Sequence, residues 1–135
     1  MPSRRDVIAS FIPASPLVAL LGMRVVSLGA DEATLELPFR GDLATVEDIV
    51  HGGAIASLID TAGMAATWAC DEEPASLRGS TVTLNVSYTA AARGRDLTAH
   101  AVVVRRGGRL VFSDVRVTEP DGRLVATGTV VQQLG

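Results

Sequence analysis

The sequence contains no lysine, a single cysteine and only 4% aromatic residues, and these scarcities exclude several classes of protein. One cysteine, Cys70, cannot form a disulfide within the chain. The net charge of −3 lacks the basic excess that nucleic-acid-binding proteins usually carry. No apolar run reaches the roughly 18 residues of a transmembrane helix, and Pro13 and Pro16 interrupt the apolar N-terminal stretches that a signal peptide would need. We therefore expect a cytoplasmic protein that binds neither nucleic acid nor a membrane.

Apolar residues make up 47% of the 135 residues, which is enough for a single domain, 1–135, with its own core. Periodicity and turn residues predict a short helix over 6–12, a short helix or turn over 16–22 and one long helix over 53–70. They predict a loop over 40–50. Strands are predicted over 23–28, 33–37, 81–88, 97–105, 110–119 and 124–133. The long helix is apolar on nearly every side, so a sheet must cover most of it. Short connections between the last four strands imply antiparallel pairing. We expect an α+β fold in which one antiparallel sheet curls around one central helix.

The start of the long helix, His51-Gly52-Gly53, is the first candidate for chemistry. The first N–H groups of a helix have no partner inside the helix and carry the positive end of its dipole. Glycine at 52 and 53 allows another group to approach that backbone, so a carbonyl oxygen that gains negative charge could bind there. Close packing of the helix would explain the same two glycines, and the pattern alone leaves both interpretations open.

Asp60 lies two helical turns after Gly53, so the two residues project from one face. A carboxylate there could act on a carbonyl as a general base or as a nucleophile, whereas a structural acid would be satisfied by Ser57 or Thr61. Seven residues rise roughly 10 Å along the axis, too far for one chain to serve one carbonyl from both ends. Two antiparallel copies of the helix would bring Gly53 of one chain opposite Asp60 of the other. The spacing therefore predicts a two-fold dimer with two shared sites.

A family resemblance rests on His51-Gly52-Gly53, Asp60, Ala62-Gly63, Leu84-Asn85-Val86-Ser87-Tyr88, Arg109 and the Asp121-Gly122 turn. Together these residues resemble the hotdog-fold acyl-CoA thioesterases, most closely the PaaI-like branch of phenylacetic acid degradation. The resemblance extends from Pro16 through Gly128 and implies a hotdog fold, with an antiparallel β-sheet wrapped around one long central α-helix. It also implies a homodimer as the minimal active unit, assembled into a homotetramer. No cofactor is expected, because coenzyme A is part of the substrate.

The resemblance assigns roles to individual residues. The Gly53 N–H would polarise the thioester carbonyl, with Gly52 beside it in the binding site for coenzyme A. Asp60 would be the catalytic carboxylate, acting as general base or nucleophile. His51 would shape the oxyanion site and hold the loop. Thr81 stands where relatives place a Ser or Thr near the catalytic water.

Two positions depart from the family pattern. Thr45 stands where the family usually has Asn, six residues before the histidine, and Asp48 stands where a glycine is common. We assign Thr45 to the catalytic site, since its hydroxyl can hydrogen-bond a water or the thioester. It lacks the amide donor of the usual asparagine.

Arginines on either side of the Gly107-Gly108 turn are candidates for binding the phosphates of coenzyme A. They are Arg105, Arg106 and Arg109. A solvated hairpin tip would show the same charges. No spacing of His, Cys and carboxylates predicts a metal site.

The predicted function is hydrolysis of the thioester of a small or medium acyl-CoA, aromatic acyl groups included, to the free acid and coenzyme A. Two alternatives come from other classes. The first is an acyl-thioester hydratase or dehydratase of the same fold, and the second is a non-catalytic protein that binds acyl-CoA.

Overall fold

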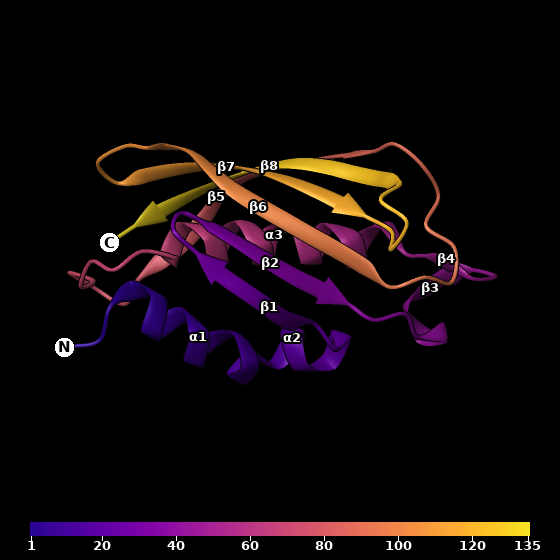
Figure 1. Ribbon diagram of the computed structural model, residues 1–135, viewed down its shortest axis with the longest axis horizontal. Coiled ribbons are helices and arrows are strands. Elements are labelled where there is room, and N and C mark those ends of the chain that lie inside the picture. The colour runs from indigo at the N-terminus through magenta and orange to yellow at the C-terminus, as the bar shows by residue number, and fades with distance from the viewer.

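A six-stranded antiparallel sheet surrounds one central helix in the computed structural model, which describes all residues from 1 to 135 (Figure 1). The strands are β1 (Arg24–Gly29), β2 (Glu32–Leu37), β5 (Gly79–Tyr88), β6 (Leu97–Arg106), β7 (Leu110–Thr118) and β8 (Leu124–Leu134). They lie in the order β1-β2-β6-β7-β8-β5, and each pairs antiparallel with its neighbour. The central helix, α3 (Gly52–Trp68), packs against all six strands. The predicted α+β fold is confirmed.

Close packing between α3 and the sheet forms the core. Leu58 and Ile59 of α3 are fully buried, and each such side chain contributes about 1.5–3 kcal/mol through loss of apolar surface from water. Small residues let the helix approach the sheet. A Cβ at Gly63 would lie 2.5 Å from the Cβ of Val130, and a Cβ at Gly128 would lie 2.6 Å from the Cγ2 of Ile59. Alanine at either glycine would therefore push α3 away from β8.

One face of α3 is left less covered than the others. Gly53 is exposed, and Ser57, Asp60, Thr61 and Met64 are half-buried. These residues recur at the spacing of one helical face, which confirms that Gly53 and Asp60 share a side of the helix. The face is the part of the central helix that this chain does not cover by itself.

Two short helices precede the sheet and lie along its β1 side (Figure 1). They are α1 (Arg4–Ala14), which packs against α3 and β1, and α2 (Pro16–Leu21). The predicted end of the first helix before Pro13 is wrong by two residues. Ile12 is buried and its carbonyl accepts a bond from the N–H of Ser15, so the last turn persists around the proline.

The segment predicted as a loop, 40–50, contains regular structure, so that prediction is wrong in part. It forms a 3-10 turn (Gly41–Leu43) and a short antiparallel pair, β3 (Ala44–Val46) and β4 (Ile49–Val50). Strands this short leave no periodicity to read in the sequence. The N–H of His51 donates to the carbonyl of Leu43 over 2.7 Å, which ties the start of α3 to this small hairpin.

Strand β5 ends the sheet on the side opposite β1, and its apolar residues are uncovered. Val82, Leu84 and Tyr88 are 50%, 38% and 53% exposed, although their alternation with polar residues is that of a half-buried strand. Only Val86 of this strand packs against the core. Strand β5 therefore presents an unpaired backbone edge beside the uncovered face of α3.

Candidate active site

The carboxylate of Asp60 is held by a chain of two hydrogen bonds from the sheet. Thr81 Oγ1 donates to Asp60 Oδ1 over 2.7 Å, and the buried Gln132 donates from Nε2 to Thr81 Oγ1 over 2.5 Å. An amide N–H and a hydroxyl that donate in series leave the carboxylate as the acceptor at the end of the chain. The hydrogen bond from Thr81 therefore fixes the orientation of the Asp60 carboxylate.

The alternative that Ser57 and Thr61 satisfy a structural Asp60 is wrong. Ser57 Oγ donates to the carbonyl of Gly53, and Thr61 Oγ1 donates to the carbonyl of Ser57, each over 2.8 Å. Both hydroxyls are thus engaged by the backbone of the preceding turn. Asp60 is half-buried, and Thr81 alone donates a hydrogen bond to it.

A β-bulge allows one strand to serve both ends of α3. Thr81 contacts Asp60, and Tyr88, seven residues later, donates its hydroxyl to the carbonyl of Gly52 over 2.7 Å. In a regular strand, residues seven apart point to opposite faces of the sheet. The pairing of β5 with β8 shifts by one residue between Thr81 and Thr83, and this shift turns both side chains toward the helix.

At the other end of the site, the predicted oxyanion donor is already engaged. His51 is the N-cap of α3, and its Nδ1 accepts the N–H of Gly53 over 2.8 Å. A Cβ at Gly53 would lie 3.0 Å from the same nitrogen, so glycine there allows the imidazole to close over the helix start. The N–H of Gly52 makes no hydrogen bond. Any carbonyl oxygen at Gly53 must therefore displace the imidazole.

Two cavities flank the start of α3, and they divide the predicted residues between them. One, of about 400 Å³, is lined by Thr45, Gly52 and Tyr88 among others. The second, of about 320 Å³, is lined by His51 and Gly53 together with side chains of α2. Thr45 is exposed, and its hydroxyl makes no hydrogen bond. The structure thus places Thr45 beside Gly52 and separates it from the cavity of Gly53.

A third, smaller pocket lies near the Asp60 end. It is mostly apolar and is lined by Val7, Ile8, Phe11, Met64, Trp68, Leu77, Gly79 and Gln132. Gln132 connects it to the hydrogen-bond chain that holds Asp60. Asp60 itself does not line the pocket, and Thr81 and Gln132 connect the carboxylate to it.

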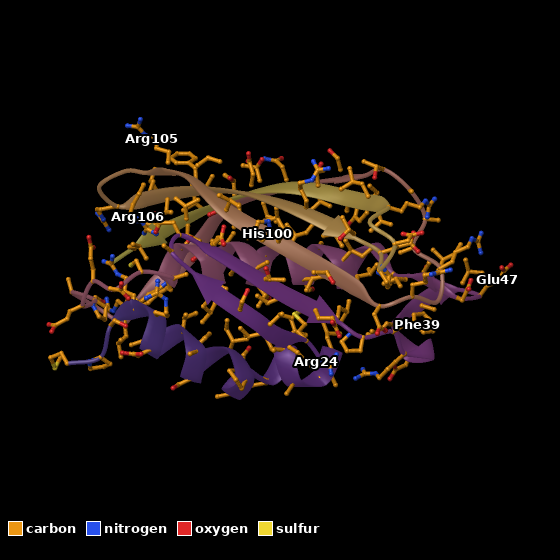
Figure 2. All side chains as sticks on the ribbon, in the orientation of Figure 1. Arg24, Phe39, Glu47, His100, Arg105 and Arg106 are labelled. Atoms are coloured by element: carbon orange, nitrogen blue, oxygen red, sulfur yellow. The ribbon has the colours of Figure 1, made fainter.

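The three candidate arginines differ in their surroundings. Arg106 is half-buried and its Nη2 donates to Asp31 Oδ1 over 2.9 Å, so its charge is already paired. Arg105 is exposed, and Figure 2 shows it projecting outward from the hairpin between β6 and β7, on the other side from Arg106. Arg109 is exposed in the turn of the same hairpin, between β6 and β7, and lies beside Gly135. Arg105 and Arg109 therefore keep guanidinium groups free for an anion, whereas Arg106 would have to leave Asp31.

Two partners of the site were not predicted from the sequence. Gln132 lies near the end of the last strand, and Tyr88 ends β5, in a segment whose sequence indicated a strand and the family resemblance but not a residue of the site. Their roles arise from contacts between residues 51 and 36 positions apart in the chain, which no local spacing can reveal. A polar residue at a buried position of an apolar strand is the one signal that marked Gln132.

No group of three or more His, Cys, Asp or Glu residues is arranged to hold a metal ion. None of the helices is long and apolar enough to cross a membrane.

Comparison with known proteins connects this geometry to a family. A family model described as the thioesterase superfamily matches residues 47–126, which is more than half of the chain. A proposed esterase of Halobacterium salinarum is 37% identical over 117 residues, which cover 84% of this chain and 77% of that protein.

Solved structures agree with that match. A thioesterase family protein from Silicibacter pomeroyi superposes with a TM-score of 0.89 at 25% identity, over 98% of this chain and 100% of that one. The PaaI protein from the phenylacetic acid degradation operon of E. coli shares the fold, with a TM-score of 0.84 at 18% identity over 98% and 94% of the two chains. The chain therefore belongs to the thioesterase superfamily, has the hotdog fold of PaaI, and is a thioester hydrolase.

Proposed function

We propose that this enzyme hydrolyses the thioester of a small or medium acyl-CoA, with Asp60 as its catalytic carboxylate. The observation that carries the proposal is the hydrogen-bond chain from Gln132 through Thr81 to Asp60 on the uncovered face of α3. A carboxylate that is held in one orientation and open to one side is suited to take a proton from water.

In the reaction, the oxygen of a water molecule attacks the thioester carbonyl while Asp60 takes one proton of that water. The carbonyl oxygen gains negative charge, and the N–H of Gly53 at the positive end of α3 stabilises it. When the tetrahedral intermediate collapses, the carbon–sulfur bond breaks and the proton on Asp60 passes to the thiolate. The products are the free acid and coenzyme A. Direct attack by Asp60 would instead form an anhydride that water then cleaves.

Each site requires two chains in this proposal. Gly53 and Asp60 of one chain are separated by roughly 10 Å along the helix, so they cannot meet one carbonyl. The uncovered face of α3 lies beside the unpaired edge of β5 with its exposed Val82, Leu84 and Tyr88. A second copy related by a two-fold axis would cover both surfaces and place its own Gly53 opposite Asp60. A homotetramer would then be a dimer of such dimers.

His51 covers the proposed oxyanion site. Its Nδ1 accepts the Gly53 N–H, and both residues line one cavity beside α2. We expect the incoming carbonyl oxygen to replace the imidazole at that N–H. Thr45 and Gly52 line the neighbouring cavity, where Thr45 offers its free hydroxyl to substrate or water.

The acyl group is assigned to the apolar pocket near Asp60. Phe11, Met64 and Trp68 are among the residues that line it, so its surface favours a compact apolar or aromatic acyl group. The exposed Arg105 and Arg109 are assigned to the phosphates of coenzyme A. No cofactor takes part in the proposed reaction. The cytoplasmic location expected from the sequence stays a prediction.

The test is a thiol-release assay across coenzyme A thioesters of increasing acyl length, with phenylacetyl-CoA and benzoyl-CoA included. We expect release with short, medium or aromatic acyl groups, and a fall in rate with long chains that the pocket cannot hold. Crotonyl-CoA distinguishes a thioesterase from a hydratase, because a hydratase would remove the enoyl absorbance without releasing thiol. Tight binding of every thioester with no turnover would identify a binding protein and overturn the proposal.

A further inference from the structure

Two side chains hold opposite ends of a single peptide unit at the start of α3. The carbonyl of Gly52 and the N–H of Gly53 belong to the same planar peptide group. Tyr88 Oη donates to that carbonyl over 2.7 Å, and His51 Nδ1 accepts from that N–H over 2.8 Å. The hydroxyl of Tyr88 therefore acts on the group that carries the proposed oxyanion donor.

The tyrosine ring also lies directly against the backbone at this point. A Cβ at Gly52 would lie 3.2 Å from Tyr88 Cζ and 3.3 Å from its hydroxyl oxygen. Glycine at 52 thus gives the ring the space it needs to reach the carbonyl. Glycine is needed at 52 because the Tyr88 ring lies against the backbone there, and at 53 because the His51 imidazole does.

Hydrogen bonds that share a peptide group polarise one another. A donor on the carbonyl draws electron density toward the oxygen and makes the N–H of the same group a stronger donor, by about 10–30% per bond. A planar group fixed at its oxygen is also fixed in the direction of its N–H. Both effects strengthen an oxyanion donor, which must point at the place where charge develops.

We infer that Tyr88 is a positioning residue of the active site, which orients and polarises the Gly52–Gly53 peptide so that its N–H stabilises the transition state. The inference rests on the proposed role of Gly53 and adds a residue that needs no contact with the reacting atoms. Strand β5 then supplies both ends of the site, with Thr81 at the carboxylate and Tyr88 at the oxyanion donor.

The first experiment compares Tyr88→Phe with wild type. The phenylalanine keeps the ring against Gly52 and removes only the hydroxyl. Removal of one oxyanion donor lowers turnover by about 10²- to 10³-fold. If loss of the Tyr88 bond removes about 10–30% of that stabilisation free energy, kcat falls by about 2- to 8-fold while KM changes little. Thr67→Val is the matched control, because Thr67 Oγ1 also donates to a backbone carbonyl, that of Gly63, at the opposite end of α3 from Gly52.

The second experiment uses the fact that Tyr88 is the only tyrosine in the chain. Expression in a tyrosine auxotroph fed fluorotyrosine replaces this residue alone, and a fluorinated phenol is a stronger donor. At a pH that keeps the phenol protonated, kcat is expected to rise with donor strength. A residue that merely fills space would show no such trend.

A third readout does not depend on turnover. The amide proton of Gly53 is expected to move upfield in Tyr88→Phe, because its bond to His51 weakens, and to stay in place in Thr67→Val. An active wild type with equal kcat in Tyr88→Phe, or a Gly53 signal that does not move, overturns this inference alone. A wild type that hydrolyses no thioester overturns the proposed function, and this catalytic role of Tyr88 with it.

Discussion

The two ends of the active face of α3 are built in opposite ways. At the Asp60 end, Gln132 and Thr81 reach across from the sheet and leave a carboxylate that is oriented but open. At the Gly53 end, His51 folds back from the helix's own N-cap and occupies the donor. The sheet thus prepares one end for substrate, while a residue of the helix start covers the other.

This difference indicates where substrate binding must change the protein. The hydrogen bonds around Asp60 can persist through a reaction, because the carboxylate keeps a second oxygen free of the Thr81 bond. The Gly53 N–H has one proton to donate, so a carbonyl oxygen and the imidazole compete for it. Variants at the Asp60 end should therefore change mainly kcat, and variants of His51 at the Gly53 end should change mainly KM.

Removing the carboxylate charge should have the largest effect. Asp60→Asn keeps the acceptor for Thr81 but cannot take a proton from water, so we expect kcat to fall by about 10²- to 10⁴-fold. The substrate should still bind. Asp114→Asn is the control, since Asp114 is exposed on β7 outside the site. Thiol release at saturating substrate measures the difference, and near-normal turnover in Asp60→Asn would remove Asp60 from the mechanism.

Breaking the hydrogen-bond chain should have the next largest effect. Thr81→Val removes the hydroxyl at nearly constant volume, and Gln132→Leu removes the amide behind it. We expect kcat to fall about 10- to 100-fold in the first and less in the second, because loss of the direct bond to Asp60 frees the carboxylate. The double variant should lower kcat little more than Thr81→Val alone, because both residues belong to one chain of hydrogen bonds. Additive losses would show that the two residues act separately.

At the Gly53 end, His51→Ala should have a smaller effect of a different kind. Loss of the N-cap costs about 1 kcal/mol of stability, which lowers Tm by about 4 °C in a domain of this size. The freed N–H no longer has to exchange partners, so KM should fall a few-fold while kcat changes little. A loss of kcat beyond about 10-fold would show that the imidazole itself contacts the reacting atoms.

The smallest effect is expected at the rim of the apolar pocket. Phe11 is 53% exposed and lines this pocket, so Phe11→Ala should widen it. We expect the optimum acyl length to shift upward by a few carbons, with kcat/KM for the best wild-type substrate reduced a few-fold. Val26→Ala, at an exposed residue outside the pocket, is the control. An unchanged acyl profile would place the acyl group elsewhere.

The features that could be predicted from the sequence are those with a regular periodicity or a local motif. The long helix, the antiparallel strands and the shared face of Gly53 and Asp60 follow from periods that sequence displays. Other features depend on the three-dimensional contacts of the folded chain. They are the hydrogen bond that occupies the Gly53 N–H, the bulge that aligns Thr81 with Tyr88, and the contact of Gln132 with Thr81. The uncovered β5 could not be predicted either, because alternation shows that a strand has an apolar face but not which chain covers it.

The central claim is that each site combines Gly53 of one chain with Asp60 of another, and a mixing experiment tests it most directly. Gly53→Pro removes the N–H at a position in the first helical turn that tolerates proline. This variant and Asp60→Asn should each be nearly inactive alone. After unfolding and refolding together in equal amounts, a shared site predicts recovery of about a quarter of wild-type activity, since one site in four draws both intact residues. No recovery in mixed oligomers, isolated by two different affinity tags, would contradict the account.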